Sequence, residues 1–435
     1  MTERIKVVGA GLAGCEAAYQ LAKRGVPVDL VEMRPKKSTP AHKTGKFAEL
    51  VCSNSLKSED VNTAQGQLKR EMRRLDSLIL RAADYARVPA GSALAVDRDL
   101  FSDYVERTLR SYKNIAFIEE EADRIEPFTI VATGPLTGEA MCEAIKEKTN
   151  GEFLNFFDAV APIVEADSVD YDLAFFAGRY GKGGEDYLNC PMDKEQYYSF
   201  VRELVSAERV LLHDFEKRDV FNACMPVEVM ADRGEDALRF GPLRPVGLID
   251  PRTDRRPYAV VQLRKENVEG TMYNLVGFQT NLKFGEQKRV FSMIPALHDA
   301  EFVRYGVMHR NTFIDAPKVL GEGFSLQSDP TVFIAGQLSG VEGYVESAAS
   351  GLLAGINAYR RLRGLPVFDP PATTMLGGLV KYVRTENKDF QPMHAGYPLT
   401  PELSEKIRDK QRRKQAYSER AERDFAPFAE EYEKQ

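Results

Sequence analysis

The opening of the chain alternates an apolar run, a glycine-rich turn and a helical pattern. Residues 5–8 form a short run rich in β-branched side chains that leads straight into glycine. Apolar positions then recur at helical spacing to about Arg24, and a second apolar run, 26–31, ends in Glu32. Strand, turn, helix and strand in this order predict a βαβ unit at the start of the chain.

Two later segments repeat the change from strand pattern to glycine. The segment 128–135 is a β-branched run that turns at a Thr-Gly pair, and a helix is expected over about 139–148. The segment 331–336 again meets glycine, and a helix with its apolar positions on one face is expected from about 346 to 363. Three such strands, far apart in sequence, predict one parallel sheet interrupted by an insertion.

The turn after the first strand has the composition of a dinucleotide-binding loop. It runs Gly9-Ala10-Gly11-Leu12-Ala13-Gly14. In such a loop Gly9 makes the tight turn, Gly11 lets a pyrophosphate approach the backbone, and Gly14 lets helix and strand pack closely. The helix N-terminus favours the phosphate charge, and Glu32 is expected to accept hydrogen bonds from the ribose hydroxyls. The combination predicts a dinucleotide site.

The pattern changes in the middle of the chain. Between about 136 and 328, short alternating runs such as 258–263 and 272–278 are separated by turns rich in Gly, Pro, Asn and Asp, which predicts a mixed α+β domain with an antiparallel sheet. We therefore expect an α/β protein with a Rossmann-type FAD-binding domain of the glutathione-reductase kind and an inserted α+β domain. The expected divisions are 1–135 and 329–400 for the FAD-binding domain, 136–328 for the insertion, and 401–435 for a charged C-terminal helix docked by one face.

Composition restricts the class of protein. The chain has 435 residues, a net charge of −6, 43% hydrophobic and 29% charged residues, which is typical of a globular protein. No apolar run approaches the ~18 residues of a membrane-spanning helix, and the N-terminus lacks the apolar core of a signal peptide, so we expect a cytoplasmic protein. The five cysteines contain no Cys-x-x-Cys pair and the five histidines no i, i+4 pair, which disfavours a disulfide framework and a metal site.

Two of the cysteines lie in unusual surroundings. Cys52 stands in a run of small polar residues soon after the dinucleotide loop, and Cys224 stands just before a proline that breaks regular structure. A cysteine is more often a small buried hydrophobe than a nucleophile. These surroundings favour Cys52 and Cys224 as reactive thiols over Cys15, Cys142 and Cys190.

Several segments together carry a family resemblance. They are residues 9–14, 40–44, 47–55, 132–137, 224–230, 304–313 and 335–347. In these segments the chain resembles the bacterial folate- and FAD-dependent tRNA uracil-5-methyltransferases, from Met1 to about Tyr397. The region 336–344 is also similar to the larger flavoprotein that modifies the wobble uridine of tRNA, but this chain is too short for that protein.

The resemblance implies a chemistry. A methylene group would pass from 5,10-methylenetetrahydrofolate to C5 of a uridine in the tRNA T-loop and be reduced to methyl, with FAD reduced by NADH or NADPH. C5 of uracil is a poor nucleophile until a thiolate adds at C6, and a base must later remove the C5 proton. We assign Cys224 to the attack on C6 and Cys52 to the role of base, protective thiol or second nucleophile, although the two roles could be exchanged. Lys57 or a helix N-terminus could lower the pKa of the Cys52 thiol.

Further residues are assigned to the cofactor. Gly336 and Gly340 would let the backbone lie against the flavin, and Tyr344 would stack on the isoalloxazine ring or on a ligand, unless it only closes a turn onto the core. The helix that starts near Glu346 would point its positive end at the ring. The expected cofactor-binding residues are Gly9, Ala10, Gly11, Leu12, Ala13, Gly14, Glu32, Thr133, Gly134, Gly336, Gln337, Gly340, Gly343 and Tyr344, with no metal.

The residues that contact the substrates are less clearly indicated by the sequence than those that contact the cofactor. The resemblance suggests that His309, Arg310 and Asn311 line the pterin side of the pocket, whereas a polar turn is the ordinary alternative. RNA contacts are expected among four basic stretches, each of which could also be a solvated helix face. They are Lys36-Lys37 with Lys43 and Lys46, Lys69-Arg70 with Arg73-Arg74, Arg252 with Arg255-Arg256, and Lys406 to Lys414. The oligomeric state is open.

Other functions remain open at this stage. An NAD(P)H-dependent flavin oxidoreductase for a small molecule accounts for the glycine motifs but gives the segments around Cys52 and Cys224 no purpose. A ribosomal RNA uridine is an alternative target for the same chemistry. An inert flavin-binding scaffold is neither supported nor excluded.

Overall fold

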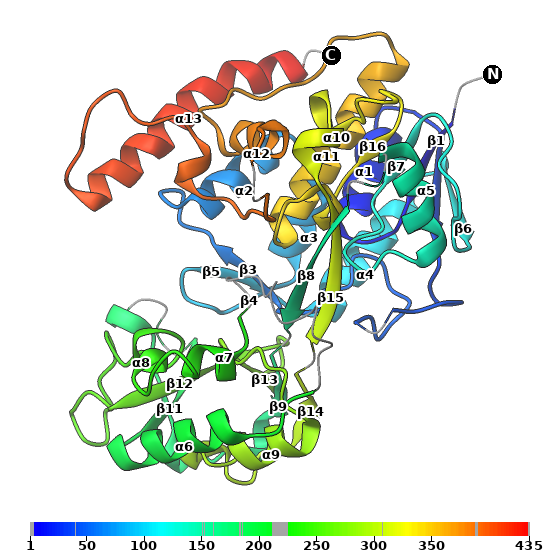
Figure 1. Ribbon diagram of the computed structural model, residues 1–435. Coiled ribbons are helices and arrows are strands. Elements are labelled where there is room, and N and C mark those ends of the chain that lie inside the picture. Colours follow the sequence, from blue (N-terminus) through cyan, green and yellow to red (C-terminus); the bar gives the residue numbers. More distant parts are fainter. Residues whose placement is uncertain are drawn as a thin grey trace.

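The chain forms two lobes around two separate sheets, as the computed structural model shows (Figure 1). The structure describes residues 4–39, 41–149, 151, 153–159, 161–181, 184, 186–210, 225–306, 308–387 and 390–433. The upper lobe contains both ends of the described chain and the parallel sheet, and the lower lobe contains the larger antiparallel sheet.

The upper lobe is built on a five-stranded parallel sheet. Its strands, in spatial order, are β16 (Phe333–Ile334), β7 (Thr129–Val131), β1 (Ile5–Val8), β2 (Val28–Glu32) and β6 (Ile115–Glu119). The three separated strand segments predicted from the sequence pair directly, β1 with β7 and β7 with β16, all parallel. Such strands are buried on both faces, which explains their nearly continuous apolar runs. The predicted Rossmann-type fold is confirmed.

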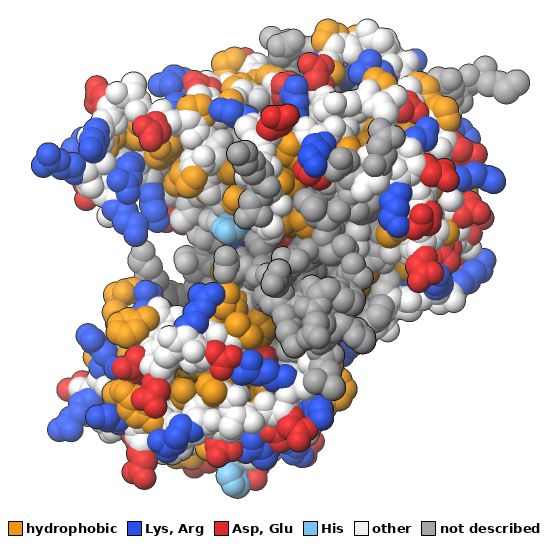
Figure 2. All heavy atoms as spheres, viewed as in Figure 1, with side chains coloured by type: hydrophobic (Ala, Val, Ile, Leu, Met, Phe, Trp, Pro, Cys, Tyr) orange, Lys and Arg blue, Asp and Glu red, His pale blue; other side chains and the backbone are white. Residues whose placement is uncertain are grey.

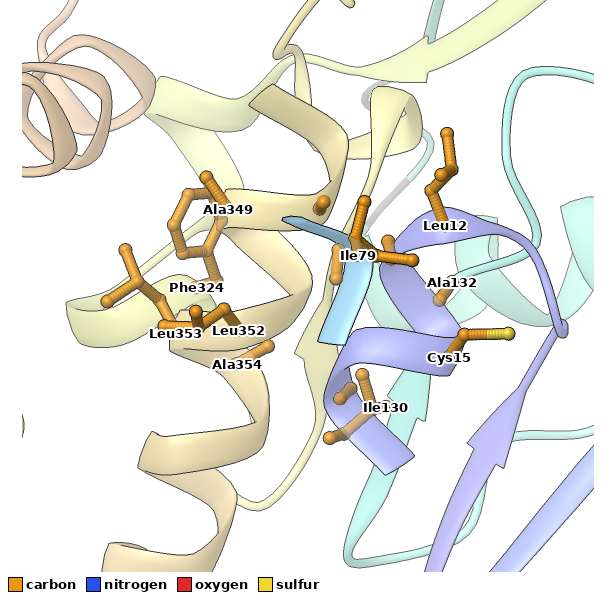
Figure 3. Packing of buried hydrophobic residues seen from close by; sticks show 14 of the residues in the cluster. Leu12, Cys15, Ile79, Ile130, Ala132, Phe324, Ala349, Leu352, Leu353 and Ala354 are labelled. Atoms are coloured by element: carbon orange, nitrogen blue, oxygen red, sulfur yellow. The ribbon is translucent and has the colours of Figure 1, made fainter. Parts of the chain in front are cut away.

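Two helices that follow glycine turns pack against each other beside this sheet. They are α1 (Leu12–Ala22) and α11 (Tyr344–Leu362), and Figure 3 shows their interface within the main core. A Cβ atom on Gly351 would lie 2.1 Å from the Ala13 carbonyl oxygen, and one on Gly355 would lie 2.8 Å from that of Ala17. The two helices are therefore in backbone contact, which only glycine allows, and their first residues both reach one cleft.

The lower lobe has its own antiparallel sheet and core. The strand order is β10 (Phe175–Phe176), β11 (Tyr187–Met192), β12 (Ala259–Lys265), β13 (Met272–Leu275), β9 (Ile163–Glu165) and β14 (Phe302–Arg304). Helices α6 (Lys194–Ser206) and α9 (Phe284–Phe291) bury apolar side chains in this core, which extends from Val164 to Ala300. The mixed α+β texture expected from the sequence is present.

A two-stranded ribbon connects the lobes. It consists of β8 (Phe153–Ala159) and β15 (Met308–Ile314), which pair antiparallel along their whole length. Before it, α5 (Glu139–Thr149) buries Met141 and Ile145 in the core of the upper lobe. The core of the lower lobe thus begins and ends well inside the expected limits of 136 and 328, since neither an amphipathic helix nor a ribbon changes the composition of the chain.

The remaining elements surround the upper sheet or complete the lower lobe. They are β3 (Ser55–Ser58), β4 (Arg87–Val88), β5 (Ala93–Val96), α2 (Ala64–Arg74), α3 (Leu78–Tyr85), α4 (Arg98–Arg110), α7 (Val227–Ala231), α8 (Ala237–Phe240), α10 (Ala316–Val319), α12 (Met375–Arg384) and α13 (Lys410–Glu433). Helix α13 buries Ala421, Phe425 and Ala429, so it docks by one face. The helix begins later than the expected residue 401, so Leu403 and Ile407 precede its first turn. No helix in the described part of the chain is long and apolar enough to cross a membrane.

Candidate active site

A cleft lies at the carboxyl ends of β1, β2 and β7, where α1 and α11 begin. It encloses about 1090 Å³ when the space open to solvent is counted. The predicted cofactor residues that line it are Gly9, Gly11, Leu12, Ala13, Glu32, Thr133, Gly134, Gly336, Gln337 and Tyr344. Ala10, Gly14, Gly340 and Gly343 do not line it.

The three glycines of the first turn have different physical reasons to be glycine. Gly9 has a φ of 101°, and a Cβ atom there would lie 2.5 Å from the Ala132 carbonyl oxygen. A Cβ atom on Gly14 would lie 1.8 Å from the Gly9 carbonyl oxygen. At Gly11, by contrast, a Cβ atom would have no protein atom within 4 Å. Gly9 and Gly14 thus serve backbone packing, whereas Gly11 keeps space open on the cleft side, where a pyrophosphate would pass.

Glu32 lines the cleft at the end of β2, and its carboxylate accepts hydrogen bonds from donors of the protein itself. One oxygen accepts from the Ala10 N–H (2.8 Å) and from Arg34 Nη2 (3.1 Å), and the other accepts from Arg34 N and Nε, both at 3.0 Å. Burial alone would raise the pKa of Glu32, but the hydrogen bonds and the charge of Arg34 hold it below its usual value. A ribose hydroxyl would have to share these acceptor sites, so the ribose contact of Glu32 stays a prediction.

Two glycines expected at the flavin shape the turn before α11 instead. Gly340 has a φ of 84°, and a Cβ atom there would meet the Phe390 ring at 2.5 Å. Gly343, with a φ of 116°, is the N-cap of α11. Both residues direct the chain into the first turn of α11, and Tyr344 is thereby presented to the cleft.

Tyr344 ties the cleft to the segment that carries Cys52. Its hydroxyl accepts hydrogen bonds from the backbone N–H groups of Cys52 (2.6 Å) and Ser53 (3.1 Å). Val51, the preceding residue, lines the cleft, and Cys52 itself is half-buried. The structure therefore places Cys52 beside the predicted cofactor site, with 292 positions between it and Tyr344 in the chain. Burial raises the pKa of Tyr344, so its hydroxyl stays protonated.

Two arginines hold the carbonyl groups of the same segment, residues 50–54, which we call the thiol loop. Arg98 donates to the carbonyl oxygens of Leu50 and Cys52, the latter at 2.8 Å, and Arg304 donates to that of Val51. Three consecutive carbonyl groups therefore face guanidinium groups. Cationic neighbours of this kind favour a thiolate over a thiol.

The thiol loop is also part of the contact between the two lobes. Arg98, at the start of α4, pairs with Glu266 just after β12 at 2.7 Å. Arg264, at the other lobe's β12, donates to Ser53 Oγ at 2.8 Å and to Asn54 Oδ1 at 2.9 Å. Because these side chains come from both lobes, movement of one lobe against the other would act on Cys52.

These arginines were not predicted from the sequence. Arg304 opens one of the segments that carried the family resemblance, so a signal existed there, but Arg98 and Arg264 stand in no motif. The lysine that we did name, Lys57, has its Nζ 3.5 Å from Glu346 Oε1 in the first turn of α11. Arg98 and Arg304 take the position beside Cys52 that the sequence suggested for Lys57.

The structure describes only some of the other predicted residues. Cys224 lies outside the described residues. His309, Arg310 and Asn311 lie in β15, where their backbones pair with residues 156–158 of β8, and their side chains are outside the described set. Cys15 and Cys190 are buried, and burial raises the pKa of both thiols, which argues against reactivity.

A second cavity touches the thiol loop between the lobes. It encloses about 1100 Å³ when the space open to solvent is counted, and it is lined by Leu50, Arg98, Glu266, Arg304 and further residues of both lobes. Val51 of the thiol loop thus lines the cleft at the carboxyl ends of the parallel strands, and Leu50 lines this second cavity. Two separate spaces therefore adjoin the thiol loop.

The parallel sheet, the glycine turn and the cleft at the carboxyl edge of the strands define a dinucleotide-binding protein of the Rossmann type. Residues 4–366 match the model of the family described as glucose inhibited division protein A. The chain belongs to the glucose inhibited division protein A family.

Individual relatives match this chain over nearly its whole length. The chain is similar to the methylenetetrahydrofolate–tRNA-(uracil-5-)-methyltransferase TrmFO of Lactobacillus gasseri, with 56% identity over 434 residues and 99% of each chain covered. The protein of the same name from Natranaerobius thermophilus is 55% identical over 430 residues, covering 98% of this chain and 99% of the relative. The resemblance inferred from the motifs is confirmed.

Solved structures support the fold. Aquifex aeolicus GidA in its form I crystal superposes with a TM-score of 0.70 at 15% identity, covering 99% of this chain and 78% of that chain. At this identity the match concerns the fold alone.

Proposed function

We propose that the protein forms 5-methyluridine in the T-loop of tRNA, with 5,10-methylenetetrahydrofolate as carbon donor, FAD as bound cofactor and NADH or NADPH as reductant. The observation that carries this proposal is the pair of hydrogen bonds from Cys52 and Ser53 to Tyr344, which fix a thiol segment to the wall of a dinucleotide cleft. The relatives named as tRNA uracil-5-methyltransferases, which match this chain over nearly its whole length, support the choice of substrate. We also propose the cytoplasm, where tRNA is modified, as the place of action.

The residues at the cleft fit FAD. Gly11 leaves room for a pyrophosphate, the first turn of α1 offers its N–H groups to the phosphate charge, and Gly336 and Tyr344 line the far end. FAD, when bound, supplies the two electrons that convert the methylene group to methyl.

The thiols would activate the uracil. A thiolate, which we assign to Cys224, adds to C6 and makes C5 nucleophilic; C5 then forms its bond to the one-carbon unit. A base, which we assign to Cys52, removes the C5 proton before the thiolate leaves C6. Arg98 and Arg304 would keep Cys52 in the basic thiolate form for this step, and the exchange of roles between the two thiols stays open.

The test uses methylenetetrahydrofolate labelled with ¹³C in its methylene group, NADPH or NADH, and unmodified tRNA transcript. Nucleoside mass spectrometry of the digested RNA should find the label in 5-methyluridine, and a T-loop uridine-to-cytidine transcript should remain unlabelled. NAD(P)H oxidation without RNA labelling would favour a small-molecule flavin oxidoreductase instead. Label in ribosomal RNA but not in tRNA would move the target to the ribosome.

A further inference from the structure

Seven of the eleven cations in the first three of the four basic stretches singled out in the sequence are paired or buried within the fold. Lys37 pairs with Glu121 at 2.6 Å and Lys46 pairs with Asp99 at 2.8 Å. In α2, Arg70 and Arg74 both pair with Glu422 of α13. These cations stabilise the protein itself and have little charge left for a ligand.

Further members of these stretches are neutralised in the same way. Arg73 pairs with Asp84 at 2.8 Å, and Lys69 is buried with its Nζ 2.8 Å from the Ser58 carbonyl oxygen. Arg252 pairs with Asp250 at 2.7 Å. Lys36, Lys43, Arg255 and Arg256 are exposed and form no ion pair with a described residue.

The segment 406–414 differs from all of them. It contains six basic side chains and a single acidic one, Asp409. Five of the six are exposed and one is half-buried, and none forms an ion pair with any residue that the structure describes. The six are Lys406, Arg408, Lys410, Arg412, Arg413 and Lys414.

The position of these cations is electrostatically unfavourable for the isolated protein. Helix α13 begins at Lys410 and has no acidic residue in its first turn, and the carboxylate of the preceding Asp409 accepts a hydrogen bond from the Arg412 N–H at 2.7 Å. Asp409 offsets the partial positive charge of the helix end, but a single carboxylate faces six basic side chains, which repel one another. A counter-charge from a bound polyanion would remove this repulsion.

The segment is nevertheless held in a defined place. Arg420 of α13 donates to the carbonyl oxygens of Pro401 (2.8 Å) and Glu402 (2.9 Å), and the Tyr397 and Tyr417 rings stack with centroids 4.6 Å apart. Phe425 anchors the same helix in the core. Figure 2 shows a group of Lys and Arg side chains at the edge of the upper lobe where α13 begins in Figure 1. The cations therefore stand on a preformed surface.

We propose that residues 406–414 form a docking surface for the sugar–phosphate backbone of the RNA substrate. The proposal rests on the proposed function for the identity of the polyanion. It explains how a chain with a net charge of −6 can bind RNA, because a local cationic surface attracts phosphates regardless of the overall charge. Since the contact is to phosphates, it adds affinity without reading sequence.

The test compares two fourfold variants of the FAD-loaded full chain. One replaces Arg408, Lys410, Arg412 and Arg413 with glutamine. The matched control replaces Lys113, Lys194, Lys288 and Arg361, four cations that are also exposed and form no ion pair with a described residue. Both variants change the net charge equally, so any difference between them reports position and not total charge.

Binding of unmodified tRNA is measured by fluorescence anisotropy across a salt series. Each phosphate contact contributes about 0.7 to 0.9 to the slope of log affinity against log salt, so the first variant should lose about three units of slope and bind ~100-fold more weakly near physiological salt. Its KM for tRNA should rise while kcat stays unchanged, and the control should match the wild type. Equal slopes for both variants, or a fall in kcat with KM unchanged, would overturn the proposal.

Two further measurements separate this inference from the proposed function and from another polyanion. If the wild type neither binds nor methylates tRNA, the proposed function fails, whatever the variants do. If the first variant keeps its tRNA affinity but loses binding to phosphatidylglycerol vesicles, the surface serves anionic lipid and the proposal is wrong. Equal FAD titrations for all three proteins confirm that the substitutions leave the fold intact.

Discussion

Replacing either of two glycines in the first turn by alanine should separate packing from cofactor binding. In Gly14→Ala the new Cβ atom would lie 1.8 Å from the Gly9 carbonyl oxygen, far inside the 3.0 Å that real Cβ atoms keep. The contact is to backbone, so the turn or α1 must move. Overpacking of this kind costs ~1–3 kcal/mol, and the helix preference for alanine returns up to ~1 kcal/mol. We expect the free energy of unfolding of the apoprotein to fall by ~1–2 kcal/mol.

In Gly11→Ala the outcome should be reversed. The residue has φ −76° and ψ −171°, which alanine adopts freely, and no protein atom lies within 4 Å of the new Cβ atom. The apoprotein should keep its stability within ~0.5 kcal/mol. The methyl group would, however, stand where the pyrophosphate passes, and FAD affinity should fall ~10- to 100-fold, or ~1.4–2.8 kcal/mol.

Urea unfolding of the apoproteins, followed by circular dichroism, and FAD titration by flavin fluorescence measure the two effects. Gly285→Ala in α9, where a Cβ atom also has no neighbour within 4 Å, controls for the substitution itself and should leave FAD affinity unchanged. Wild-type FAD affinity in Gly11→Ala would show that the pyrophosphate does not cross this turn. Equal destabilisation by Gly11→Ala and Gly14→Ala would refute the packing argument.

Three further predictions concern the thiol loop and the buried thiols. Tyr344→Phe removes the acceptor of the Cys52 N–H, and leaving a buried donor unpaired costs ~1–3 kcal/mol. Single-turnover methylation should therefore slow about 10-fold or more while FAD affinity is unchanged. Loss of FAD with normal methylation would contradict this. Arg98→Met leaves the buried Glu266 carboxylate without its partner, whose own side chain is 21% exposed, and should lower the free energy of unfolding by up to ~3–5 kcal/mol. Urea titration measures this, and a variant as stable as the wild type would refute it. Because burial raises the pKa of Cys15 and Cys190, their thiolate fractions stay small at pH 8, and peptide mass spectrometry after iodoacetamide treatment should find label on Cys52 well before either; equal labelling rates would show that the buried pair is accessible.

The parallel sheet was predictable because its signals are local. Each strand meets glycine within a few residues, and the turn at Gly9 combines a positive φ with close packing that only glycine permits. The acidic end of β2 was found by the same motif. What the motif could not reveal is that Arg34 and the Ala10 N–H already occupy the Glu32 carboxylate, since those contacts depend on how the following loop folds back.

The surroundings of Cys52 were not predictable, because its partners are distant in the chain. Arg98, Arg304 and Tyr344 are separated from the thiol loop by 46, 253 and 292 positions. Nothing in an arginine at the start of a helix indicates that it will bind carbonyl groups of another segment. The limits of the insertion were not predictable for a different reason. The ribbon of β8 and β15 crosses between the lobes without a change in composition.

A single-turnover reaction tests the central claim most directly, since that claim joins the dinucleotide cleft and the thiol loop into one site. Holoprotein with its FAD reduced by light under anaerobic conditions is mixed with unmodified tRNA and methylenetetrahydrofolate, without NAD(P)H and without S-adenosylmethionine. We predict up to one 5-methyluridine per FAD, formed as the flavin is reoxidised. No methylation by the fully reduced protein, or methylation of equal yield by protein freed of FAD, would contradict the account.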